Sequence, residues 1–227
     1  MKKGMKIFIK IMLFYIVWAT VISVIPDIKT DNPALLRFWY ELTPLLAVIL
    51  LSIIAIIFIE KREVNIPLLK TPIRNTAIGV VTSILWLGFP VVIMLNSGLM
   101  KIESQNPITS LWLWILAVFL NVIMQEYLVR GLVYQLIKRR YNIFVATLIT
   151  SVIFTGLHGG VFEAGIISIL NIVSMSLFVT ALLEYTETIL APIIVHSIWN
   201  IIGGILLNGV SLAGTTQTYL IRINYLK

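Results

Sequence analysis

Three groups of polar side chains interrupt apolar stretches in the second half of the chain. They are Gln125, Glu126 and Arg130, then His158 within "FTGLHGG", then His196 and Asn200 within "HSIWN". The chain contains only two histidines, and both lie in these groups. An ionisable group inside a bilayer costs at least about 2.5–3.5 kcal/mol, so such residues are candidate functional residues.

Hydrolysis of a peptide bond is the chemistry that these residue types favour. The reaction needs an activated water and a group that stabilises the developing oxyanion. A histidine with a carboxylate could supply the first, and a histidine with an asparagine the second. The sequence contains no H-E-x-x-H zinc motif, no G-x-S-x-G elbow and no cysteine, and its only aspartates, Asp27 and Asp31, fall in a loop. Other protease mechanisms are therefore disfavoured.

The spacing of the polar residues predicts which of them share a helix face. Three pairs are separated by four residues: Glu126 and Arg130, His196 and Asn200, and Asn121 and Gln125. Residues four apart lie on one face, so Glu126 and Arg130 are expected to pair. Gln125 and Glu126 point about 100° apart on a helix and should have different roles.

The elements that must position these residues are membrane helices. Of the 227 residues, 59% are hydrophobic and 12% charged, whereas soluble domains carry about 25% charged residues. We expect a single membrane domain over residues 1–227. The net charge of +7 comes mostly from residues at helix ends, which predicts contact with membrane lipid and no nucleic-acid partner.

The hydropathy pattern predicts an all-α, polytopic helical bundle with about seven transmembrane helices. The expected spans are 7–25, 42–59, 76–97, 109–132, 142–158, 164–183 and 189–207. The first is interpreted as an uncleaved signal anchor. Most lysines and arginines then fall on one side, which places the N-terminus in the cytoplasm and the C-terminal tail outside.

Helical rise predicts that the three polar groups meet at a similar depth. From the turn at Arg140–Tyr141, Gln125 lies about 23 Å back and His158 about 26 Å forward. His196 lies about 12 Å from the "EYTET" loop on the same side. We therefore expect a shared pocket in the cytoplasmic half of the membrane, with the two imidazoles within roughly 11 Å of each other.

The three groups resemble the motifs of the CAAX-protease and bacteriocin-processing (Abi) family, which are E-E-x-x-x-R, F-x-x-x-H and H-x-x-x-N or H-x-x-x-D. The resemblance covers residues 108–207. It implies an intramembrane endopeptidase of a peptide or protein substrate, in a bacterial cell membrane. It also implies that the first acid and His158 activate water, while His196 and Asn200 form the oxyanion site. The family is often called metalloproteases; no cofactor is required, but a metal ion at Glu126, His158 and His196 is left open.

Gln125 stands where the family has its first glutamate, and an amide cannot serve as a general base at neutral pH. Three interpretations remain open: Glu126 replaces the acid with help from His158, the chain is an inactive immunity or regulatory protein, or the glutamine is an engineered change. A structural salt bridge of Glu126 with Arg130 is an alternative to catalysis, as is a hydrogen bond of His196 or Asn200 that joins helices. A proton-coupled transporter is a weaker possibility. The oligomeric state is not predicted.

Overall fold

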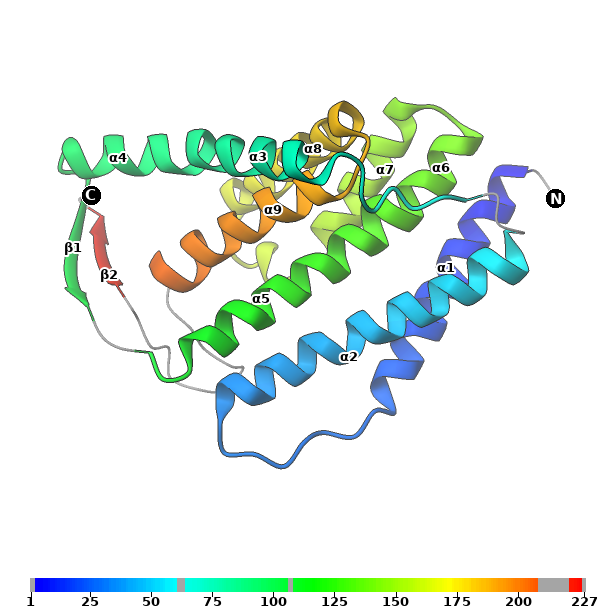
Figure 1. The fold of residues 1–227 in the computed structure, drawn as a ribbon, viewed down its shortest axis with the longest axis horizontal. Coiled ribbons are helices and arrows are strands. Elements are labelled where there is room, and N and C mark those ends of the chain that lie inside the picture. Colours follow the sequence, from blue (N-terminus) through cyan, green and yellow to red (C-terminus); the bar gives the residue numbers. More distant parts are fainter. Residues whose placement is uncertain (1–2, 61–63, 106–107, 208–220, 226–227) are drawn as a thin grey trace.

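Long apolar helices make up most of the chain (Figure 1). The computed structural model describes residues 3–60, 64–105, 108–207 and 221–225. The elements are α1 (Lys3–Ser23), α2 (Pro33–Ile54), η1 (Ala55–Ile59), α3 (Pro72–Ser83), η2 (Ile84–Gly88), α4 (Phe89–Asn96), β1 (Met100–Gln105), α5 (Leu111–Glu126), η3 (Tyr127–Val133), α6 (Tyr134–Arg140), α7 (Ile143–Gly156), η4 (Gly159–Val161), α8 (Ile166–Thr186), α9 (Leu190–Trp199), η5 (Asn200–Leu207) and β2 (Ile221–Tyr225).

Helix length and composition identify a multi-pass membrane protein. Within the described ranges, 5 helical stretches are long and apolar enough to cross a membrane, and two shorter apolar helices cover Ile143–Gly156 and Leu190–Gly204. The predicted polytopic bundle of about seven helices is confirmed. The helix α7 has 14 residues and is about 21 Å long, which is shorter than a bilayer core of about 30 Å.

Several helices extend beyond the predicted spans. The second was expected to begin at residue 42 but begins at Pro33, because Asn32 caps it by accepting hydrogen bonds from the backbone N–H groups of Ala34 and Leu35. Similarly, the helix that carries Glu126 continues through η3 and α6 to Arg140. Hydropathy windows mark where the apolar residues end, and a helix ends only where its backbone hydrogen bonds do.

The helix α5 crosses the middle of the bundle, between α2 and α9 (Figure 1). On the other side of α9 lies α3, and the two pack closely at Gly79. A Cβ atom added there would lie 2.9 Å from Cβ of Ile194 and 3.2 Å from the carbonyl oxygen of Ala191. Glycine at this position therefore lets α3 approach α9 and fixes where α9 stands.

A two-stranded antiparallel sheet, absent from the sequence prediction, joins β1 to β2. Its register pairs Met100 with Tyr225 and Gln105 with Ile221. Figure 1 shows this pair at the end of α4, beside the label of the C-terminus. The loop after the third span and the described part of the tail therefore lie at the same end of the bundle, as an arrangement of seven spans requires.

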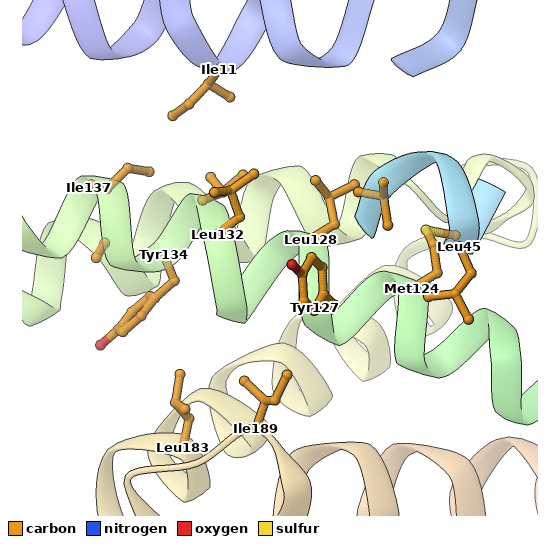
Figure 2. Packing of buried hydrophobic residues seen from close by; sticks show 13 residues of the cluster. Ile11, Leu45, Met124, Tyr127, Leu128, Leu132, Tyr134, Ile137, Leu183 and Ile189 are labelled. Carbon is orange, nitrogen blue, oxygen red and sulfur yellow. The ribbon is translucent and has the colours of Figure 1, made fainter. Parts of the chain in front are cut away.

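The largest cluster of buried apolar side chains surrounds the π-helical segment η3 (Figure 2). Figure 2 shows Ile11 of α1, Leu45 of α2 and Leu183 of α8 around Tyr127, Leu128 and other residues of this segment. The segment begins directly after Glu126. Short π-helical segments are frequent at functional sites, and this one is held rigidly by packing on several sides.

Candidate active site

Glu126 lies at the centre of the polar residues and its side chain is fully buried. Its Oε1 accepts a hydrogen bond from Nη1 of Arg130 at 3.2 Å and another from Nδ1 of His196 at 2.8 Å. The predicted pairing of Glu126 with Arg130 is therefore present. The histidine that it holds is His196 of α9, whereas His158 was the partner expected from the sequence.

Arg130 connects three helices in the interior. Its Nη2 donates to Oγ of Ser176 at 2.7 Å and to the carbonyl oxygen of Ser176 at 3.2 Å. Ser176 Oγ in turn donates to Oγ of Ser151 on α7 at 3.1 Å. The guanidinium carbon also lies 4.0 Å from the ring centroid of Phe154, which is a cation–π contact. A fully buried charge is thus compensated by a carboxylate, two oxygens and an aromatic ring.

His158 follows α7 and is half-buried. Its Nδ1 lies 2.8 Å from the carbonyl oxygen of Phe154. Because a carbonyl oxygen only accepts hydrogen bonds, Nδ1 must carry the hydrogen of the neutral ring. Nε2 then has a free lone pair and is a hydrogen-bond acceptor, which is the state that a general base requires.

The two imidazoles lie close together, as the sequence predicted. Their ring centroids are 6.4 Å apart. The Phe154 ring contacts both, with its centroid 4.7 Å from that of His158 and 5.4 Å from that of His196. His196 is 2% exposed and donates its Nδ1 hydrogen to the Glu126 carboxylate. Each ring is therefore oriented through Nδ1, which leaves both Nε2 atoms for chemistry.

Gln125 and Asn200 have surroundings unlike those of Glu126. Gln125 is 7% exposed, and its Nε2 donates to Oδ1 of Asn121 at 2.8 Å. Asn200 is half-buried at the junction of α9 and η5, one turn after His196, and its side chain has no hydrogen bond to the described residues. Gln125 and Glu126 thus contact different groups, which agrees with their predicted directions.

The polar residues that support the site from other helices were not predicted from the sequence. Ser151 and Ser176 were read as parts of apolar spans, although small hydroxyl residues in membrane helices are a recognised source of interhelical hydrogen bonds. Glu41 was placed outside the second span by one residue. It is 6% exposed, forms an ion pair with Arg37, and accepts a hydrogen bond from Asn121 Nδ2 at 2.6 Å.

The surroundings of a metal ion, which the sequence left open at Glu126, His158 and His196, can be compared with the described side chains; Oε2 of Glu126 is buried and has no hydrogen-bond partner among them. No group of three or more histidine, cysteine, aspartate or glutamate residues among them is arranged to hold a metal ion. The most central oxygen, Oε1 of Glu126, already accepts hydrogen bonds from Arg130 and His196. The guanidinium beside it would also repel a cation.

A family comparison covers the segment that contains all these residues. Residues 107–202 match the family model described as "Type II CAAX prenyl endopeptidase Rce1-like". The resemblance to the CAAX-protease and bacteriocin-processing family is confirmed. The match begins just before α5 and ends shortly after Asn200, so α5 to α9 have a CAAX-protease-type fold. Searches of curated proteins and of solved structures found no match.

Proposed function

We propose that the protein is an intramembrane endopeptidase of the CAAX-protease type, which hydrolyses a peptide bond with two histidines. The arrangement of His158 and His196 carries this proposal. Both rings are oriented through Nδ1 and their centroids are 6.4 Å apart, which leaves two neighbouring Nε2 atoms to act on one substrate.

His158 is the general base in this proposal. Its Nε2 accepts a proton from water while the water oxygen forms a bond to the carbonyl carbon of the substrate. The C–N bond then breaks, and the same Nε2 returns the proton to the departing amine. The products are a carboxylic acid and an amine, so atoms and protons balance.

His196 and Asn200 stabilise the oxyanion that forms on the carbonyl oxygen. In this step His196 carries a hydrogen on each ring nitrogen: Nδ1 donates to the Glu126 carboxylate at 2.8 Å, and Nε2 donates to the oxyanion. Asn200 lies one helical turn further on and offers its side-chain N–H groups. Glu126 therefore acts by orienting His196, and Arg130 holds Glu126 in place.

The substrate is proposed to be a peptide or protein presented at the membrane. The description of the matching family, a CAAX prenyl endopeptidase, supports a lipid-modified C-terminal segment as the first class to test. The polar site is expected in the cytoplasmic half of a bacterial cell membrane, with the N-terminus in the cytoplasm. No step requires a metal ion.

Cleavage by purified protein in liposomes tests the proposal. Prenylated and unmodified CAAX peptides would be supplied with a fluorophore and quencher that flank the scissile bond. We expect His158→Ala and His196→Ala to abolish turnover, while Glu184→Gln, in a partly exposed ion pair with Lys138, keeps it. Undiminished cleavage by His158→Ala, with product confirmed by mass spectrometry, would refute the mechanism.

A catalytically inactive family member, acting in bacteriocin immunity or regulation, is the second candidate. Gln125 favours it, since an amide stands at the position of the family's first acid. The Gln125→Glu variant separates the two. If the natural sequence cleaves none of the peptides and the variant does, the inactive interpretation holds.

A further inference from the structure

A chain of polar side chains, buried at Glu41 and at Gln125, leads from α2 to Gln125. Arg37 forms an ion pair with Glu41, which accepts a hydrogen bond from Nδ2 of Asn121 at 2.6 Å. Asn121 Oδ1 accepts one from Nε2 of Gln125 at 2.8 Å. Glu41 is 6% exposed and Gln125 is 7% exposed. Asn121 therefore connects a buried carboxylate on α2 with a buried amide on α5.

The direction of every hydrogen bond in this chain follows from the carboxylate. In its ion pair with Arg37, the Glu41 carboxylate accepts hydrogen bonds, and Nδ2 of Asn121 lies 2.6 Å from its Oε2. Asn121 must therefore turn its NH₂ group toward Glu41 and its carbonyl oxygen toward Gln125. Gln125 must in turn donate through Nε2, so its own oxygen, Oε1, lies at the opposite side of the amide.

Oε1 of Gln125 is buried and has no hydrogen-bond partner among the described residues. A buried acceptor without a partner is costly, and here it occurs at the position where the family has its first acid. A carboxylate would present an oxygen in either orientation of its planar group. An amide presents an oxygen in only one, so a chain with glutamine here needs something to fix the orientation.

We propose that Glu41, acting through Asn121, is a positioning residue that orients the Gln125 amide so that Oε1 accepts a hydrogen bond from the attacking water. This inference rests on the proposed function. Gln125 then holds the water without removing its proton, and His158 serves as the base. Glu41 on α2 thereby fixes an orientation that a carboxylate at position 125 would not need.

The orientation is measurable without any catalysis. In ¹⁵N-labelled protein in lipid nanodiscs, the side-chain NH₂ signals of Gln125 are identified by their loss in Gln125→Glu. We expect Glu41→Gln to move the hydrogen-bonded proton upfield or to split the signals into two sets, because a neutral amide no longer dictates how Asn121 turns. The control is Ser52→Ala, which removes a 2.7 Å hydrogen bond to Tyr127 from the same face of α2 without touching this chain.

Kinetics supply the second measurement. With Gln125 in place, Glu41→Gln should lower kcat about tenfold with little change in KM, which corresponds to one hydrogen bond made in the transition state. In the Gln125→Glu background, the same substitution should change kcat less than about twofold, since a carboxylate needs no orientation. Asn121→Ala interrupts the chain at its middle and should reproduce the first result if Glu41→Gln does not fold.

The NMR and kinetic measurements together separate this inference from the proposed function. Gln125 signals that Glu41→Gln leaves unmoved, or an equal loss of kcat in both backgrounds, would overturn the role of Glu41. If the signals move as expected but the natural sequence cleaves nothing, the proposed function fails and the orientation of the amide by Glu41 stands.

Discussion

The buried pair of Glu126 and Arg130 gives the sharpest test of the site's energetics. We predict that Glu126→Leu and Arg130→Met each destabilise the protein strongly, while the double variant recovers most of the loss. Both side chains are fully buried, with 3.2 Å between Arg130 Nη1 and Glu126 Oε1. At that distance the attraction is roughly 5 kcal/mol for an effective dielectric constant of about 20. Burial of the two charges opposes it.

Each single variant leaves one buried charge without its counter-ion, which typically costs about 3–5 kcal/mol. The double variant removes both charges. It leaves unpaired mainly Nδ1 of His196, at about 1–3 kcal/mol, because the hydroxyl of Ser176 still donates to Ser151. The free energy of unfolding should therefore fall by about 3–5 kcal/mol in each single variant, and the double-mutant coupling should be at least about 3 kcal/mol.

Unfolding by dodecyl sulfate in mixed micelles, followed by tryptophan fluorescence, measures these free energies. The matched control is the ion pair of Lys138 with Glu184, which also joins two helices but is partly exposed. Lys138→Gln should cost no more than about 1 kcal/mol. If the losses in Glu126→Leu and Arg130→Met simply add in the double variant, the pair is not the energetic unit described here.

Three further measurements address the scaffold and the chemistry. Gly79→Ala should lower the free energy of unfolding by about 1–3 kcal/mol because its Cβ would press against Ile194; Gly156→Ala, where nothing lies within 4 Å, is the control and should not destabilise. Asn32→Ala should cost about 1 kcal/mol by removing the cap of α2, visible as faster amide hydrogen exchange in its first turn alone. Peptide cleavage should persist at full rate after chelation with EDTA and phenanthroline, and a loss restored by added zinc would contradict the metal-free scheme.

The sequence predicted the membrane helices, the residues that gather and the pairing within one helix, but not the pairing between helices. Apolar length determines a membrane helix, so the bundle could be predicted; residues four apart on one helix must be neighbours, so Glu126 and Arg130 could be paired. The choice of His196 as partner of Glu126 depends on how α9 is rotated and shifted against α5. That placement is set by contacts such as Gly79 against Ile194, which no pattern within α9 reveals.

Glu41 was missed for a related reason. A carboxylate near the end of an apolar stretch is usually assigned to the loop, and the predicted span began one residue later. The cap at Asn32 carries the helix further, so Glu41 falls inside it and faces Asn121. The sheet of β1 and β2 joins segments more than 100 residues apart in the sequence, and pairing at such distance has no local signal.

The charges around Gln125 lead to a final prediction. Each buried carboxylate at this interface has its own guanidinium, Glu41 with Arg37 and Glu126 with Arg130. A third carboxylate at position 125 would be balanced by neither, so Gln125→Glu should lower the free energy of unfolding by about 2–3 kcal/mol at neutral pH. Adding Glu41→Gln to Gln125→Glu should recover most of that loss, because the number of buried negative charges returns to two.

Stability of the two variants against pH, measured by the same unfolding titration, checks this balance. The deficit of Gln125→Glu should shrink as the pH falls and the added carboxyl is protonated. If the loss of unfolding free energy in Gln125→Glu depends neither on pH nor on Glu41, its cause is the shape of the side chain and not its charge.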